Sequence, residues 1–105
     1  MKRLIQFFRT PSTWLQNAMA LNTDGELVNL NEFPSETKIQ ALSLHGAVAH
    51  LFSYEREPER RQKIMDRLSK AIRQYTGKSY FVAEYNNLPT TTFEDIKAIL
   101  KIADQ

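Results

Sequence analysis

The feature of the sequence that most restricts its fold is the spacing of four prolines, at positions 11, 34, 58 and 89. Proline breaks the hydrogen bonding of a helix interior or of a central strand. We therefore expect helices and strands to begin or end near these positions. A chain of 105 residues has room for one domain, residues 1–105, with one modest core.

The clearest local pattern is a β-hairpin over residues 19–30. Asp24 and Gly25 are typical of a two-residue turn in which both positions adopt positive φ. That turn sets Leu21 opposite Val28 and gives the hairpin one apolar face and one mostly polar face. The residues expected on the apolar face are Met19, Leu21, Val28 and Leu30.

Helices are expected before and after the hairpin. An apolar arc predicts a short helix over residues 2–9. Residues 36–53 are apolar on nearly every side, which predicts a central, buried helix. Pro58 suits the first turn of a third helix, which runs to about residue 75 and is capped by Gly77.

The C-terminal quarter of the chain predicts a short strand and a last helix. Residues 80–85 are aromatic and β-branched, as strands are. Thr91 or Thr92, with Glu94 or Asp95 three residues later, forms a capping box. The sequence thus predicts an α+β fold. A hairpin, with residues 80–85 as a candidate third strand, packs on a central buried helix, and two or three further amphipathic helices surround it.

Several chemistries lack the residues that they need. The chain has no cysteine, which excludes disulfides, thiolate metal sites and a cysteine nucleophile. His45 and His50 lie about 140° apart on a helix, so they do not form a helical metal-binding pair. Ser43 or Ser53 beside a histidine is better explained as an interior polar residue with local partners. We expect no metal, no cofactor and no enzymatic activity, although a pocket near His45 and Asn86 would support an enzyme or small-ligand binder.

No segment is typical of a membrane span or a secretory signal. The longest stretch without Asp, Glu, Lys or Arg, residues 39–54, has sixteen residues. A spanning helix needs about 18 or more. We therefore expect a cytoplasmic protein without a membrane partner.

A basic stripe supports one alternative function, nucleic-acid binding. The net charge is only +2, yet residues 55–80 carry eight basic and four acidic side chains. Five of the basic residues recur along one face of the third predicted helix, where they can follow phosphates. Glu59 and Asp66 lie four residues before the two lysines of the stripe, a spacing that favours ion pairs and leaves the three arginines unpaired. The stripe comprises Arg56, Arg60, Lys63, Arg67 and Lys70.

Aromatic residues support the leading hypothesis, a non-enzymatic protein that binds an unknown protein partner. Trp14 is the only tryptophan and lies in a polar segment. Tryptophan and tyrosine are favoured at the energetic centres of interfaces. We expect a partner-binding surface with Trp14, Tyr85 and Asn86.

The order of several short motifs resembles a known family. Trp14-Leu-Gln-Asn-Ala18 precedes Asp24-Gly25-Glu-Leu-Val28, and an alanine-rich segment with Gly46-Ala47 follows. A segment from Tyr85 to Pro89, with Asn86 and Asn87, comes before the last helix. Over residues 12–103 this order is similar to the DUF6197 family, small bacterial and phage-associated proteins without assigned function.

The resemblance implies a single small domain, a turn-forming Asn86 and a phage-derived accessory role, but no reaction. The family pattern has a cysteine where this chain has Ser43, a tryptophan at Tyr85 and an aspartate at Asn87. Chemistry that depends on that cysteine or aspartate is therefore not expected here.

Overall fold

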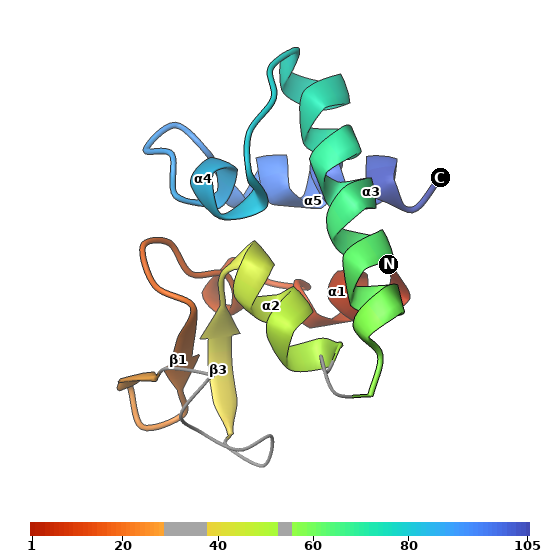
Figure 1. Ribbon diagram of the computed structural model, residues 1–105. Coiled ribbons are helices and arrows are strands. Elements are labelled where there is room, and N and C mark those ends of the chain that lie inside the picture. Colours follow the sequence, from red (N-terminus) through yellow and green to blue (C-terminus); the bar gives the residue numbers. More distant parts are fainter. Residues whose placement is uncertain (29–37, 53–55) are drawn as a thin grey trace.

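The computed structural model describes residues 1–28, 38–52 and 56–105. They form helices and one three-stranded antiparallel sheet, which confirms the expected α+β fold (Figure 1). The sheet lies at one end of the molecule and α4 and α5 lie toward the other, with α1 and α2 between them, and α3 runs from that far end to the level of α1 and α2. The elements are α1 (Lys2–Phe7), a 3-10 turn (Pro11–Thr13), β1 (Ala20–Asn22), β2 (Leu27–Val28), β3 (Ile39–Leu42), α2 (Leu44–Leu51), α3 (Pro58–Thr76), α4 (Val82–Asn86) and α5 (Phe93–Ala103).

The hairpin forms, but the predicted register is wrong by one residue. Ala20 pairs with Val28 and Leu21 with Leu27. The turn has three residues instead of two, because the Asn22 side chain accepts hydrogen bonds from the backbone of Asp24 and Glu26 and Gly25 adopts φ 84°. Ala20 and Val28 therefore share the buried face, and Leu27 is 67% exposed. Leu30 lies outside the described residues.

The central helix is shorter than predicted. Residues 39–42, expected within a helix over 36–53, form β3 and pair with β1, so the strand order is β2-β1-β3. Ser43 separates the strand from α2, because its hydroxyl accepts a hydrogen bond from Gly46 N at 2.9 Å and caps the helix. Strand and helix are both largely buried, which explains why the whole segment is apolar on nearly every side.

The predicted strand over residues 80–85 is also wrong. Residues 82–86 form α4, and Glu84 accepts a hydrogen bond from Phe81 N at 3.3 Å at its start. The third strand of the sheet is β3. Beta-branched and aromatic composition is a weak signal in so short a segment, because side-chain packing decides its conformation.

The other expected helices and their caps are confirmed. Gly77 ends α3 with φ 78°, and Thr92 and Asp95 cap α5 with reciprocal hydrogen bonds. One apolar cluster joins the helices to the sheet and fixes their arrangement. Its fully buried members include Leu4, Leu42, Val48, Leu68, Ile72, Ile96 and Ile99.

Candidate functional site

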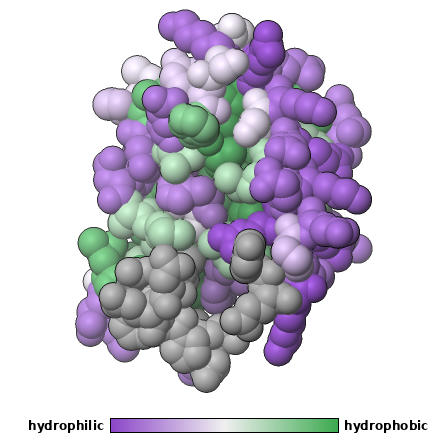
Figure 2. Space-filling model, in the orientation of Figure 1, coloured by the Kyte–Doolittle hydropathy of each residue, from purple (hydrophilic) through white to green (hydrophobic). Residues whose placement is uncertain are grey.

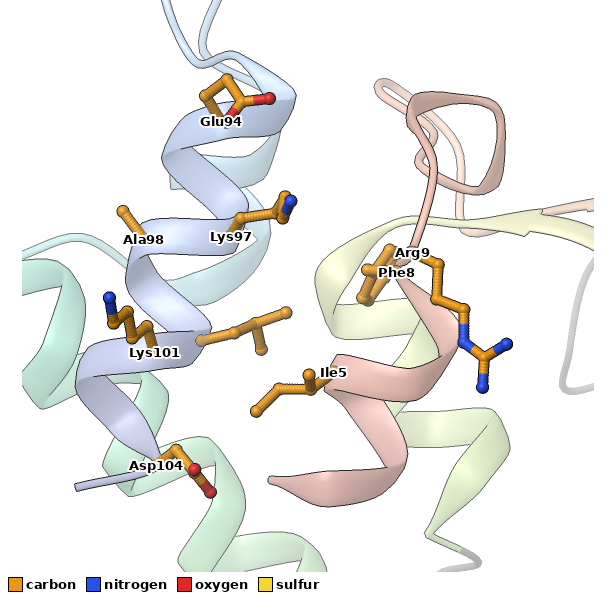
Figure 3. A pocket seen from close by; sticks show the side chains of 9 residues that line it. Ile5, Phe8, Arg9, Glu94, Lys97, Ala98, Lys101 and Asp104 are labelled. Carbon is orange, nitrogen blue, oxygen red and sulfur yellow. The ribbon is translucent and has the colours of Figure 1, made fainter.

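A groove of about 620 Å³ lies between α1 and α5 (Figure 3). Its floor is apolar and includes Phe8, which follows α1, and Leu100 of α5. Figure 3 shows Ile5 extending from α1 toward α5. Phe8 and Leu100 are each 2% exposed, whereas Ile5 is 40% exposed. The groove thus combines a packed floor with an apolar side chain that solvent reaches.

Charged side chains border this groove. Figure 3 shows Glu94 and Asp104 near opposite ends of α5, with Lys97 and Lys101 between them and Arg9 on the α1 side. Within residues 1–28, 38–52 and 56–105, the ion pairs join Glu57 to Arg3 and Arg60, and none involves these five residues. Basic residues therefore border the groove on both sides, with one carboxylate near each end.

Trp14 and Asn86, two of the three predicted partner-binding residues, are brought together. The indole Nε1 of Trp14 donates a hydrogen bond to Asn86 Oδ1 at 2.7 Å, and Leu44 N donates to the same oxygen at 2.9 Å. Asn86 Nδ2 donates to Leu15 O at 3.0 Å. Asn86 is fully buried and Tyr85 is 4% exposed, so of the three residues only the half-buried Trp14 offers appreciable surface. Partner binding by these residues stays a prediction.

Gln16 and Asn87 extend this hydrogen-bonded cluster. Gln16 Nε2 lies within hydrogen-bond distance of three carbonyl oxygens, of which the nearest is Leu88 O at 2.9 Å. Asn87 Oδ1 accepts from Asn17 N at 2.8 Å, where Asn17 has a positive φ of 66°. The cluster joins the segment before β1 to α4 and the loop that follows it. Our site prediction missed Gln16, although its spacing from Trp14 was part of the motif order.

The profile of a family of unknown function, DUF6197, matches residues 7–105. The chain belongs to the DUF6197 family. No curated protein and no solved structure matches it. Three motif segments that carry the DUF6197 resemblance, around Trp14, around Gly46 and around Asn86, come together where Asn86 bonds to Trp14 and to the start of α2.

Ser43, where the resemblance implied a cysteine in the family pattern, acts as a helix cap. Its Oγ lies 3.2 Å from His45 Nε2, and the residue is fully buried. Burial lowers the pKa of His45, and His45 Nδ1 is a buried atom without a hydrogen-bond partner among the described residues. A serine that solvent cannot reach does not present a nucleophile in this conformation. Ser53 lies outside the described residues.

All five residues of the basic stripe are exposed on or just before α3. The expected pairing is wrong: Arg60 contacts Glu57 at 3.2 Å, and Asp66 accepts from Gln62 at 3.0 Å. Neither lysine of the stripe forms an ion pair with another residue that the structure describes. Figure 2 shows hydrophilic side chains over the side of the molecule where α3 lies in this view.

Arg3 adds a further cation beside the stripe in this DUF6197 protein. Its guanidinium lies 2.9 Å from Glu57 and 4.9 Å from the centre of the Phe52 ring. The hydrogen bond from Arg3, followed by that from Arg60, lowers the pKa of Glu57. Glu57 therefore stays ionised and offsets part of the positive charge.

The described residues contain no group of three or more His, Cys, Asp or Glu side chains placed to hold a metal ion. Of the helices described here, none is long and apolar enough to span a bilayer.

Proposed function

We propose that this DUF6197 protein is a small, non-enzymatic interaction protein that binds a partner protein in the α1/α5 groove. The observation that carries the proposal is the exposed Ile5 beside an apolar floor. Apolar anchors in a partly formed pocket supply most of the energy of an interface. In keeping with the family resemblance, we propose a phage-derived accessory protein that acts in the cytoplasm.

The charges around the groove define the occupant. Arg9 borders the groove on the α1 side, and Lys97 and Lys101 border it on the α5 side. In Figure 3 Lys97 points toward α1, whereas Arg9 and Lys101 point outward, so basic groups lie along both outer edges of the groove. An amphipathic helix suits this arrangement when acidic residues flank its apolar stripe. We therefore propose an acidic amphipathic helix of the partner protein as the occupant.

The test compares the intact protein with two groove variants as baits in host lysate treated with nuclease. The variants are Ile5→Glu and the pair Lys97→Glu/Lys101→Glu, and Leu27→Glu serves as the control at an exposed apolar position of β2. We expect the intact protein and the control to retain one protein that both groove variants lose. Each groove variant should bind this captured protein about tenfold or more weakly than the intact protein does.

The captured protein must then bind through an acidic amphipathic segment, as proposed for the groove. Peptides that cover its sequence should locate binding in an acidic amphipathic segment. Equal capture by all four baits, or binding through a basic segment, would contradict the proposed function.

The basic stripe supports a second candidate function, binding to nucleic acid. The observation in its favour is that Lys63 and Lys70 are exposed on α3 without an ion pair to any other described residue. Phosphate contacts release counterions, so affinity for a duplex should fall steeply with salt. Fluorescence anisotropy should show a loss of binding in Lys63→Glu/Arg67→Glu/Lys70→Glu, and salt-independent binding would count against this function.

A further inference from the structure

A second cavity, of about 440 Å³, lies where the end of α3 approaches α4 and the start of α5. Three tyrosines line it: Tyr75 of α3, Tyr80 of the connecting loop and Tyr85 of α4, of which Tyr85 is 4% exposed. The rings of Tyr80 and Tyr85 are in contact, with centroids 5.9 Å apart and planes inclined by 41°. Neither Ile5 nor any other residue of the α1/α5 groove lines this cavity.

Asp95 places one carboxylate among these rings. Its Oδ1 accepts a hydrogen bond from the Tyr75 hydroxyl at 2.9 Å, and its Oδ2 accepts from Thr92 N at 2.9 Å. Burial raises the pKa of Asp95, but these hydrogen bonds outweigh it and lower the pKa overall. The carboxylate is therefore ionised at neutral pH.

Tyr85 remains a neutral phenol beside this charge. Burial, followed by the negative charge of Asp95, raises the pKa of Tyr85 to about 12. Lys78 also borders the cavity but forms no ion pair with Asp95. The negative charge of Asp95 is thus not cancelled by a cation within the described residues.

We propose that this pocket binds an organic ammonium group, whose charge faces Asp95 and whose methyl or methylene groups pack on the rings of Tyr75 and Tyr80. Aromatic rings attract cations through their negative faces, and a nearby carboxylate adds to this attraction. An anionic ligand would instead be repelled by Asp95. The single carboxylate is also too few ligands for a metal ion.

Choline and its neutral isostere, 3,3-dimethylbutan-1-ol, test the proposal, because they share shape and differ in charge. In NMR titrations of the full chain, choline should shift the tyrosine ring signals and bind about tenfold more tightly than the isostere. Equal binding of the two compounds, or no saturable binding of choline, would overturn the proposal.

Three variants locate the site. Tyr80→Phe keeps the ring and should retain choline binding, whereas Tyr80→Leu should weaken it by about tenfold. Lys78→Ala removes a like charge and should strengthen binding, with Lys63→Ala on α3 as the unaffected control. An unchanged or weaker affinity for choline in Lys78→Ala would show that the ammonium charge does not lie in this pocket and would overturn the proposal, even if Tyr80→Leu fails to fold.

One further ligand identifies the source of the ammonium group. An amide of Nε-trimethyllysine that binds much more tightly than choline would point to a protein side chain. Comparable or weaker binding would point to a free small molecule. Both results support the ammonium site.

Discussion

Asn86 links three distant parts of the chain through hydrogen bonds of its side chain. Its side-chain oxygen accepts from Trp14 and Leu44, and its nitrogen donates to Leu15. Replacing it by alanine leaves these three groups without partners in a largely buried site. A buried polar group without a partner costs about 1–3 kcal/mol.

Asn86→Ala should therefore lower the free energy of unfolding by about 3 kcal/mol, measured by urea denaturation. Gln74→Ala, at an exposed amide of α3, is the matched control and should change stability by less than about 0.5 kcal/mol. A similar, small effect of both substitutions would show that the cluster around Asn86 does not stabilise the fold.

The sequence marked Asn86 as a turn-forming and candidate binding residue, but not as the centre of a hydrogen-bonded cluster. Its partners Trp14 and Leu44 lie 72 and 42 residues away, so no local pattern reveals them. Gly77 and Thr92, by contrast, act within their own helix ends and were predicted correctly. Local signals thus located the caps, whereas the cluster required the tertiary structure.

At the scale of elements, α2 approaches the sheet through Gly46. A Cβ atom at this position would collide with the carbonyl oxygen of Met19, just before β1, and would lie 2.8 Å from Ser43 Oγ. Helix propensity alone predicts that alanine here stabilises the helix by about 1 kcal/mol. The collision acts in the opposite direction, because backbone atoms must move to relieve it.

We expect Gly46→Ala to destabilise the protein by about 1–3 kcal/mol, measured by thermal or urea unfolding. Ser69→Ala, on the exposed side of α3, is the control. It measures the stabilisation that alanine provides through helix propensity where no new contact forms. Stabilisation by both substitutions would mean that α2 has room to move away from β1.

The elements that were predicted well are those whose local sequence pattern is enough to identify their secondary structure. The apolar periodicity of α1, α3 and α5 marks one face of each helix, and their limits were close to those observed. In β3 and α4 the apolar run is too short to distinguish a strand from a helix. Residues 39–42 form a strand because they pair with β1. Residues 82–86 form a helix that packs against α2 and α3.

At the scale of the whole molecule, burial of both histidines makes stability depend on pH. Burial lowers the pKa of His45 and of His50 below 6.5 in the folded state. The unfolded chain therefore binds protons more readily as the pH falls. These groups have no effect on stability well above pH 6.5 and destabilise the fold below it.

The free energy of unfolding should therefore fall as the pH drops below about 6.5. The double variant His45→Gln/His50→Gln should remove this fall, which urea titrations at several pH values would detect. A second decrease should follow at lower pH, as Glu57 and Asp95 become protonated, because the pKa of each is lowered in the folded state. An unchanged profile in the double variant would exclude the histidines as its cause.

Because Trp14 is hydrogen-bonded to Asn86, its intrinsic fluorescence can report on the Asn86 cluster. Trp14 is the only tryptophan, and its ring lies 6.5 Å from that of Phe93, the first residue of α5. All indole fluorescence therefore originates at one site that touches the Asn86 cluster and the helix that forms one wall of the groove. Emission wavelength and intensity can follow events at both places without an added label.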